Sequence, residues 1–474
     1  MLLQRIYDPL LAQASYLIGC QATGEAVVVD PNRDIEQYVA AARAERMKIT
    51  HVTETHIHAD FCSGSRELAQ RTGAQLLLSA EGGADWSYRF AKDAGATLLS
   101  NGDRFMVGNI ALDVRHTPGH TPEHLCFLVT DTPATGAPMG MLSGDCVFVG
   151  DVGRPDLLER AAGHQGTMAE SARTLFGTIQ AIKPLPDHLQ IWPGHGAGSA
   201  CGKALGAVPS STLGYERIAN WAFQIGDEDE FVRAVLAGQP EPPRYFAVMK
   251  RMNRDGPPAV PRERPARIDA VRLAQLLATG SGACVVDTRS AAAFAAGHLH
   301  GTISIPLNRA FAGYAGWVLP YDRDVWLLTD PARPDAADEG ARQLRLIGLD
   351  RVAGWLPLDA AVLAGATERV TQIAPRELAQ RLEAGTVSVV DVRGRGEWEA
   401  GRLPGAPNIH YGQLLDRLDE LPAGPLVVQC ETGARSNLAA SLLLARGRSD
   451  VLNLTGGMSA WRAAGLPVEE PQFV

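Results

Sequence analysis

One short stretch, Thr55-His-Ile-His-Ala-Asp-Phe61, decides the fold of this chain. The residues before it, Ile49-Thr-His-Val-Thr-Glu54, are rich in β-branched side chains and predict a strand. His56, His58 and Asp60 therefore cluster where a strand ends. Imidazole and carboxylate groups are ligands for zinc, iron or manganese. The stretch thus predicts a metal site at the edge of a sheet.

Three more candidate ligands follow along the chain, each after an apolar run and inside a turn that contains glycine. They are His120 in Thr117-Pro-Gly-His, Asp145 in Leu142-Ser-Gly-Asp, and His195 in Trp192-Pro-Gly-His. Such turns let the backbone approach a site closely and hold the side chain in place. A single histidine after a strand is more often an ordinary hydrogen-bonded group. The ordered set of four motifs favours metal binding over that alternative.

The order and spacing of these motifs resemble the metallo-β-lactamase fold, which is a four-layer αββα sandwich with its metal site at one edge. Members of that family usually have a histidine where Phe61 stands here. In two-metal members that histidine holds the second metal together with the equivalents of Asp60 and His195. Asp60 and His195 alone make a poor metal cage, so the sequence predicts one metal per chain.

The resemblance extends to the persulfide dioxygenase branch of this fold. It implies one Fe(II) per chain, held by His56, His120 and Asp145. This ligand set leaves coordination positions open for a persulfide and for O2. The implied products are sulfite and a free thiol. His58, Asp60 and His195 would then orient ligands or bound water around the metal.

Two residues near these motifs are candidates for substrate handling. Arg154, in Asp151-Val-Gly-Arg, matches a Gly-Arg of the persulfide dioxygenases and would clamp a carboxylate of the thiol carrier. The alternative is a loop arginine that caps nearby carbonyl groups. Cys201, in Gly194-His-Gly-Ala-Gly-Ser-Ala-Cys, would receive or pass sulfane sulfur near the iron, with Lys203 favouring its thiolate. Its alternative is a small residue in a tight loop.

The second half of the chain contains a linker and an internal repeat. The prolines between Met252 and Pro265 predict an extended linker. After it, Val285-Val-Asp-Thr-Arg289 recurs as Val389-Val-Asp-Val-Arg393. Short apolar runs alternate with helix-like stretches in both copies, which predicts parallel sheets. The expected domains are 1–250, a linker at 251–265, and α/β units at 266–366 and 371–474.

The last unit carries a reactive thiol. Cys430 follows the apolar run Leu426-Val-Val-Gln429, and a helix-like stretch begins just after it. Backbone N–H groups and the helix dipole favour a thiolate in such a loop. The Cys-x4-Arg spacing to Arg435 is one residue shorter than the loop of cysteine phosphatases. The loop resembles that of rhodanese sulfurtransferases, which implies that Glu431, Thr432, Gly433 and Ala434 bind the substrate and that Arg435 binds sulfite or thiosulfate.

The first copy of the repeat lacks the thiol. Asp330-Pro-Ala-Arg-Pro334 stands where the loop is expected, and an aspartate cannot carry sulfur. Its two prolines also remove N–H donors from the loop. Residues 266–366 are therefore expected to form an inactive rhodanese-like domain that serves spacing or assembly.

Composition limits the classes of partner. The chain has 474 residues with 46% hydrophobic residues and a net charge of −9. The acidic balance disfavours nucleic acid, and no apolar window is long enough to predict a membrane span. The N-terminus lacks a signal-peptide pattern, so a cytoplasmic protein is expected. The resemblance further implies a homo-oligomer.

Together these features predict an αββα sandwich followed by two rhodanese-like α/β domains with parallel sheets. The predicted function is oxidation of a low-molecular-weight thiol persulfide to sulfite, coupled to sulfur transfer at Cys430 that forms or uses thiosulfate. Two alternatives remain. One is a thioester hydrolase similar to glyoxalase II, and the other is a non-enzymatic sulfur carrier or scaffold. The sequence identifies neither the thiol carrier nor the direction of sulfur transfer.

Overall fold

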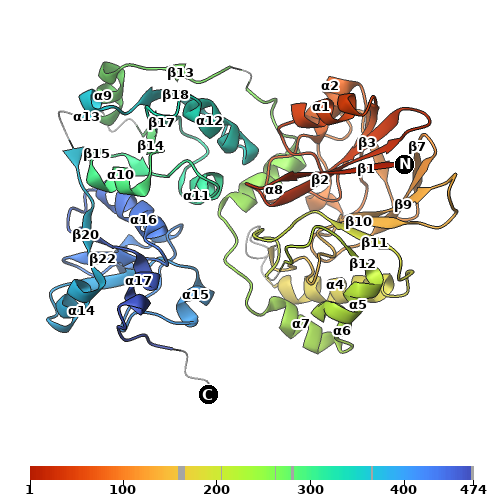
Figure 1. Ribbon diagram of the computed structural model, residues 1–474. Helices are drawn as coiled ribbons and strands as arrows, with labels where there is room; N and C mark the ends of the chain where they lie inside the picture. The colour runs from red at the N-terminus through yellow and green to blue at the C-terminus, as the bar shows by residue number, and fades with distance from the viewer. Residues whose placement is uncertain (158–165, 204, 262, 279–281, 364–366, 471–474) are drawn as a thin grey trace. The chain divides into compact units, whose positions relative to one another are not determined.

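The computed structural model of the chain describes residues 1–157, 166–203, 205–261, 263–278, 282–363 and 367–470 (Figure 1). It divides into two units. One comprises Met1–Val260 with Arg345–Gly348, and the other comprises Pro261–Leu344 with Leu349–Val474.

The first unit is built on two six-stranded sheets. Their strand orders are β1-β2-β3-β4-β5-β6 and β12-β11-β10-β9-β8-β7. The strands of the first sheet are β1 (Leu2–Asp8), β2 (Gln13–Cys20), β3 (Glu25–Val29), β4 (Lys48–Thr53), β5 (Gln75–Ser79) and β6 (Thr97–Leu99). Those of the second are β7 (Arg104–Val107), β8 (Ile110–His116), β9 (Leu125–Asp131), β10 (Gly140–Gly144), β11 (Gln190–Pro193) and β12 (Ser211–Thr212).

Helices cover the outer face of each sheet (Figure 1). The first sheet carries α1 (Glu36–Ala44) and α2 (Ser65–Thr72). The second carries α4 (Met168–Ile182), α5 (Leu213–Ala219), α6 (Trp221–Gln224) and α7 (Glu228–Leu236). The unit ends with α8 (Tyr245–Asp255).

Three hydrophobic cores separate the four layers. Along β2, Leu17 packs with the helices α1 and α2, whereas its neighbours Tyr16 and Ile18 pack between the two sheets. This alternation follows from the two-residue period of a strand. On the outer face of the second sheet, Leu128 packs against α4 and α7. The predicted αββα sandwich is therefore confirmed.

The linker begins later than the sequence predicted. Residues 251–255 form the last turns of α8 instead of extended chain. Asn253 explains the difference, because its buried side chain donates to the carbonyl oxygens of His58 (2.7 Å) and Phe61 (2.8 Å). The helix ends where Gly256 adopts a φ of 100°, just before the first proline of the linker.

Besides the two-stranded sheet β15-β19, the described part of the second unit contains two larger sheets of related topology. The first has the strand order β13-β18-β17-β14-β16 and the second has the order β20-β23-β22-β21. All the pairings within these two sheets are parallel. The predicted parallel sheets are confirmed, and the order of the first four strands is the same in both copies.

The elements of the first copy are β13 (Ala266–Arg267), α9 (Ala270–Ala278), β14 (Cys284–Asp287), α10 (Ala291–Ala296), β15 (His298–Leu299), β16 (Ile303–Ser304), α11 (Phe311–Val318), β17 (Val325–Thr329), α12 (Ala336–Leu346), β18 (Val352–Pro357), α13 (Ala360–Leu363) and β19 (Thr367–Glu368). Those of the second are β20 (Thr371–Ile373), α14 (Pro375–Glu383), β21 (Ser388–Asp391), α15 (Arg395–Glu399), β22 (Leu426–Gln429), α16 (Ala434–Leu444), β23 (Val451–Leu454) and α17 (Gly457–Ala463).

Both copies keep the same buried ion pair at the end of a strand. Arg289 Nη2 lies 2.7 Å from Asp287, and Arg393 Nη2 lies 2.7 Å from Asp391. Each arginine also donates to the carbonyl oxygen of a glycine, Gly297 or Gly401. Since the copy without a thiol has the same arrangement, this pair supports the fold of each copy.

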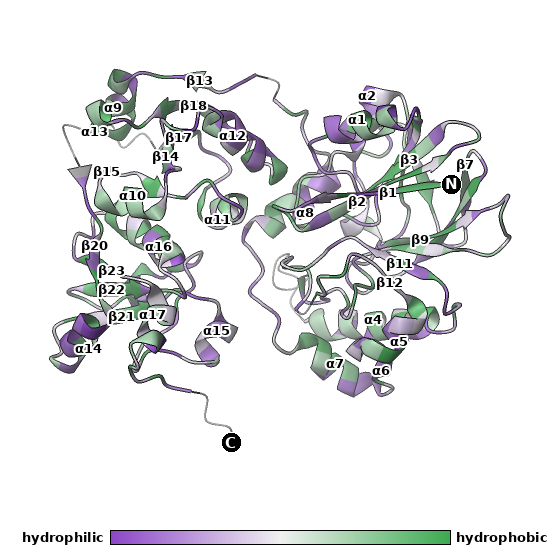
Figure 2. Cartoon of the chain, in the orientation of Figure 1, coloured by the Kyte–Doolittle hydropathy of each residue, from purple (hydrophilic) through white to green (hydrophobic). Residues whose placement is uncertain are grey.

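Hydropathy follows the layers (Figure 2). Surface helices such as α14 are largely hydrophilic, and Leu378 is its buried side chain. Within the part of the chain that the structure describes, no helix is both long enough and apolar enough to cross a membrane.

Candidate metal centre and thiol loop

The structure brings His56, His120 and Asp145 together at one edge of the sandwich. One ligand atom from each lies within 4.8 Å of the others, and all three residues are buried. His120 Nε2 is 3.4 Å and His56 Nε2 is 3.9 Å from Asp145 Oδ2. His56 follows β4 of the first sheet, whereas His120 and Asp145 follow β8 and β10 of the second.

Hydrogen bonds fix both imidazoles so that Nε2 is left for a ligand. His120 Nδ1 lies 3.1 Å from the carbonyl oxygen of Arg154, and a carbonyl can only accept, so Nδ1 carries the proton. His56 Nδ1 lies 2.9 Å from Thr55 Oγ1, which itself donates to Asp30 Oδ2 at 2.9 Å. This chain of donors makes Nδ1 of His56 the protonated atom. Such partners orient metal-binding histidines.

A hydrogen bond from its own backbone N–H positions Asp145. Its N–H donates to His124 Nε2 at 3.0 Å, while His124 Nδ1 lies 2.8 Å from Thr117 Oγ1. Both carboxylate oxygens of Asp145 are buried without a hydrogen-bond partner. A Cβ on Gly194 would come within 2.8 Å of Asp145 Oδ1, so glycine is required there for the carboxylate to fit.

The electrostatics of this group suit a cation. Burial, together with neighbouring histidines, lowers the pKa of His56 well below its usual value. Burial also lowers the pKa of His120. Both rings are therefore neutral and offer lone pairs, and the orphaned carboxylate oxygens of Asp145 complete a donor set that fits a divalent metal ion.

Sequence reasoning missed the residues that orient these ligands. Asp30 accepts from the Thr55 N–H at 2.6 Å and lies 3.0 Å from His58 Nε2. His124 positions Asp145 by accepting a hydrogen bond from its backbone N–H. In the sequence, Asp30 is marked by its position directly after the apolar end of β3 (Glu25–Val29). Its partners Thr55 and His58 lie far along the chain, so the sequence does not show them.

His58 lies outside the group of three ligands. Burial opposes its protonation, but Asp30 raises the pKa of His58 to about 9. Its ring packs on Phe61, with the ring centroids 4.3 Å apart. Phe61 thus fills its position with an apolar ring and supplies no donor atom.

Asp60 and His195 belong to a second buried group, and Cys201 joins them. His195 Nε2 lies 3.3 Å from Asp60 Oδ2 and 3.4 Å from Asp145 Oδ1. The expected influence of Lys203 on the Cys201 thiol is wrong. Lys203 Nζ donates to the Ala237 carbonyl oxygen at 3.4 Å and lies over the Trp221 ring. Burial and the carboxylates of Asp60 and Asp145 raise the pKa of Cys201 well above its usual value.

Arg154 does not face a substrate, contrary to the prediction. Its side chain is fully buried, and it pairs with Asp156 through two hydrogen bonds of 2.7 Å. Its guanidinium also donates to the carbonyl oxygens of Ala200 (3.1 Å) and Pro240 (2.6 Å). These contacts are the ones that the alternative interpretation, a loop arginine that caps carbonyl groups, predicts, and the chain itself supplies an acidic partner two residues away.

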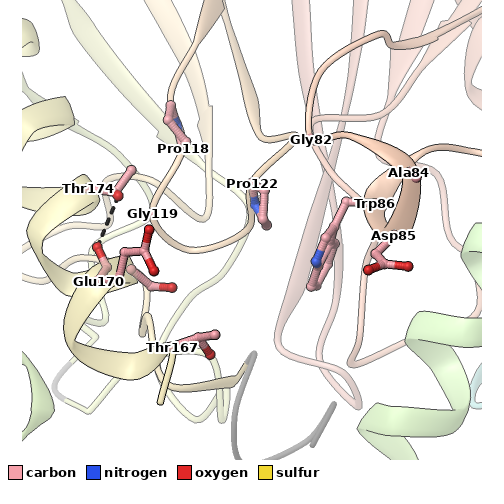
Figure 3. Close-up of a pocket in the computed structure, with 11 residues that line it drawn as sticks. Gly82, Ala84, Asp85, Trp86, Pro118, Gly119, Pro122, Thr167, Glu170 and Thr174 are labelled. Carbon is pink, nitrogen blue, oxygen red and sulfur yellow. Dashed lines mark hydrogen bonds between the residues drawn. The ribbon is translucent and has the colours of Figure 1, made fainter. Parts of the chain in front are cut away.

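A cavity of about 410 Å³ lies beside the loop that carries His120 (Figure 3). Pro118, Gly119 and Pro122 line one part of it, and Trp86 lines another. Its titratable lining residues are acidic: Asp85, from the segment with Trp86, and Glu170 of α4.

In the second unit, the thiol loop connects a strand to a helix. Cys430 lies between β22 and α16, and its Sγ accepts from the Gly433 N–H at 3.2 Å and from Ser436 Oγ at 3.3 Å. Gly433 adopts a φ of 96°, which turns its N–H toward the sulfur. These donors stabilise negative charge on the sulfur.

The charged residues of the loop are paired. Arg435 makes two hydrogen bonds to Glu397 of α15, at 2.6 and 2.7 Å. Glu431 pairs with Arg393 at 3.0 Å and with Arg462 at 3.3 Å, which anchors the loop. A cavity of about 730 Å³ is lined by Thr432, Gly433 and Ala434, by α10 residues of the first copy, and by other residues of the second copy.

Family models match two parts of the chain. The Metallo-beta-lactamase superfamily matches residues 8–195, and the Rhodanese-like domain matches residues 374–464. Among curated proteins, hydroxyacylglutathione hydrolase of Nitrosococcus oceani is 32% identical over 38% of this chain and 61% of its own length. The chain thus spans about three fifths of that relative. Persulfide dioxygenase ETHE1, mitochondrial, of Bos taurus is 29% identical over 41% of this chain and 68% of its own length.

One solved structure matches a larger share of the chain than the Metallo-beta-lactamase superfamily model does. The metallo-beta-lactamase from Staphylococcus aureus subsp. aureus COL is 42% identical, with a TM-score of 0.66. The match covers 75% of this chain and 99% of that one. The chain belongs to the metallo-beta-lactamase superfamily, and it carries a rhodanese-like domain at its C-terminal end.

Proposed function

We propose that this chain oxidises a low-molecular-weight thiol persulfide with O2 at a single Fe(II) held by His56, His120 and Asp145. The observation that carries the proposal is the buried group of two neutral imidazoles and one carboxylate, whose two oxygens have no hydrogen-bond partner. Such a set suits non-haem iron with open positions. The likeness to a persulfide dioxygenase supports the substrate class.

The reaction converts one persulfide, one O2 and one water into a thiol, sulfite and two protons. Iron bound to these ligands would supply a redox-active centre with positions for both substrates. The chain's own residues position the ligands. Thr55 is hydrogen-bonded to both Asp30 and His56, and the Arg154 carbonyl oxygen is hydrogen-bonded to His120. We assign to His58, Asp60 and His195 the orientation of ligands and water.

We further propose that Cys430 carries sulfane sulfur. Its thiolate takes the outer sulfur of a second persulfide and releases the thiol. Sulfite then attacks that sulfur and leaves as thiosulfate, which regenerates the thiolate; the reverse path would use thiosulfate as the sulfur donor. The donors from Gly433 and Ser436 support this role by stabilising the thiolate. The substrate-binding role of Thr432, Gly433 and Ala434 is supported by the cavity they line.

We also propose that residues 266–366 form an inactive rhodanese-like domain, that the chain works in the cytoplasm and that it forms a homo-oligomer. The shared strand order of the two sheets supports the first point. The free state of all seven cysteines favours a reducing compartment. Sulfur relay at Cys201 stays part of the proposal because its thiol lies beside the ligand group.

A second candidate function is hydrolysis of a thioester, favoured by the likeness to hydroxyacylglutathione hydrolase. That activity would use zinc or a metal pair instead of one iron. The rhodanese-like domain and Phe61 both favour the persulfide reaction over it, because a sulfur-transferring partner domain has no part in thioester hydrolysis.

The test is oxygen uptake by the full chain, depleted of metal and reloaded anaerobically with Fe(II), with glutathione persulfide as the probe. We expect one iron per chain and persulfide-dependent uptake, both lost in His120→Ala. The surface variant His188→Ala is the control and should keep both. Hydrolysis of a hydroxyacylglutathione by the zinc form, without any oxygen uptake by the iron form, would overturn the proposal.

A further inference from the structure

The copy without a thiol packs its helix α11 against the segment between α15 and β22 of the other copy. Both copies belong to the second unit. The ring centroids of Trp317 and His410 lie 4.4 Å apart, and those of Tyr314 and Tyr411 lie 5.6 Å apart. A Cβ on Gly412 would overlap the Trp317 ring, so the chain needs a glycine there for α11 to approach this closely. The contact is therefore built by residues of both copies.

The hydroxyl of Tyr314 lies within electrostatic range of the thiol loop. Burial raises the pKa of Tyr314 above its usual value, so the hydroxyl keeps its proton at neutral pH. The charges of Arg435, Cys430 and Glu397 also act on this hydroxyl. It has no hydrogen-bond partner among the residues that the structure describes. Tyr314 thus offers an unused hydrogen-bond donor to a ligand at the thiol loop.

The charged and imidazole side chains around this hydroxyl bind an oxyanion poorly by themselves. Arg435 makes two hydrogen bonds to Glu397, at 2.6 and 2.7 Å, so its positive charge is shared. Burial, together with Arg435, lowers the pKa of His410 to about 4, so its ring is neutral and adds no positive charge. The two donors described above already bind the sulfur of Cys430. An oxyanion that approaches this sulfur therefore gains from a further donor.

We propose that the Tyr314 hydroxyl donates a hydrogen bond to an oxygen of sulfite as sulfite attacks the sulfur carried by Cys430. The copy without a thiol thereby takes part in the reaction of the other copy, through the helix that it packs against it. This role depends on the proposed sulfur transfer at Cys430. It adds to that reaction a residue that favours acceptors with oxygen atoms over acceptors without them.

The step moves one sulfur atom and no proton. The lone pair on the sulfur of sulfite forms a bond to the outer sulfur of the Cys430 persulfide. The bond between that outer sulfur and Cys430 Sγ breaks, and its electron pair stays on Sγ as the thiolate. With the persulfide as its anion, the total charge is the same before and after the step. Thiosulfate leaves with the oxygen atoms of sulfite, so the Tyr314 hydroxyl donates to them throughout and keeps its proton.

Competition between two acceptors tests this role in the full chain. The chain is loaded with glutathione persulfide, freed of excess persulfide, and mixed with sulfite and cyanide together in the absence of oxygen. Ion chromatography measures thiosulfate from sulfite and thiocyanate from cyanide, which has no oxygen atom. Sulfur carried elsewhere is measured in Cys430→Ser and subtracted. We expect Tyr314→Phe to lower the ratio of thiosulfate to thiocyanate about tenfold, the size expected for one hydrogen bond to a charged group.

Trp317→Phe is the matched control, because it alters the same contact between the copies and leaves the Tyr314 hydroxyl in place. It should keep the wild-type ratio. A wild-type ratio in Tyr314→Phe, whether both products form more slowly or neither does, would overturn the role of Tyr314 alone. An equal fall of the ratio in Trp317→Phe would overturn it as well, because packing would then set the ratio. Wild type that forms neither product above the Cys430→Ser level would overturn the proposed sulfur transfer, and the role of Tyr314 with it.

Discussion

Glu397 and Arg435 illustrate how single residues set the chemistry of the thiol loop. The proposed anion-binding arginine is already paired with a carboxylate of α15, at 2.6 and 2.7 Å. Any sulfite or thiosulfate that reaches Arg435 must share it with Glu397. The pair therefore both orients the guanidinium and reduces its free positive charge.

This ion pair predicts a pH dependence of stability. Burial opposes ionisation of Glu397, but its pairing with Arg435 lowers the pKa of Glu397 overall. A carboxyl group with a lowered pKa stabilises the fold above its unfolded pKa, and that contribution is lost as the pH falls through the folded pKa. Wild type should thus exceed Glu397→Gln in free energy of unfolding at neutral pH, and the difference should shrink progressively as the pH falls below about 4.

Urea denaturation at a series of pH values, followed by tryptophan fluorescence, measures this difference; Trp398 lies next to Glu397 in the chain. Glu399→Gln is the matched control, because Glu399 pairs with Arg395 in an exposed bridge on the same helix. A difference between wild type and Glu397→Gln that stays constant with pH would contradict the argument.

At the residue scale, the sequence predicts the proposed metal ligands better than it predicts the residues that surround those ligands. His56, His120 and Asp145 each stand in a short local motif after a strand, and local motifs are visible in one dimension. Arg154 was misassigned because the sequence does not show which carboxylate an arginine pairs with. The placement of Cys201 beside Asp60 depends on contacts between segments far apart in the chain.

At the scale of elements, the turn from β22 into α16 depends on a second segment, the start of α17. Gly457 there has a φ of 58°, and a Cβ at this position would lie 2.2 Å from the Cys430 carbonyl oxygen. The Met458 N–H donates to that same oxygen at 2.8 Å. The thiol loop is therefore positioned by the N-terminus of α17 as well as by its own residues.

We expect Gly457→Ala to displace the loop and lower the sulfurtransferase kcat by about a hundredfold, since displacement of a reacting group by about 1 Å has effects of this size. Gly447→Ala is the control, because Gly447 also has a positive φ of 85° but has nothing within 4 Å of an added Cβ. Both variants incur backbone strain, so equal loss of kcat in the two would contradict the role of the close contact.

The elements themselves were largely predictable. The β-branched run before His56 and the repeated Val-Val-Asp-x-Arg stretch indicated sheets that the structure contains. The start of the linker was not predictable, because α8 continues through residues 251–255 owing to the buried hydrogen bonds of Asn253.

At the scale of the whole molecule, the product of the proposed iron site is a substrate of the proposed sulfur-transfer site. If both act, two persulfides and one O2 should yield one thiosulfate. In Cys430→Ser the sulfite has no sulfane sulfur to attack, so each persulfide should consume one O2 and yield one sulfite. Ion chromatography alongside oxygen uptake measures both ratios.

His120→Ala is the converse variant. It should lose oxygen uptake and retain sulfur transfer from thiosulfate to cyanide, because Cys430 belongs to the other unit. Thiosulfate formed at the wild-type ratio by Cys430→Ser would contradict this division of labour and would point to another sulfur carrier.

The donors of the metal centre come from both sheets of the sandwich, with His56 after β4 of one and His120, Asp145 and His195 after β8, β10 and β11 of the other. An ion bound by them would link the two sheets through directional coordination bonds. The apolar core that otherwise holds the sheets together has no directional preference. Sliding of one sheet over the other would then require breaking a coordination bond. Metal loading should therefore make the first unit mechanically stiffer against shear of one sheet over the other.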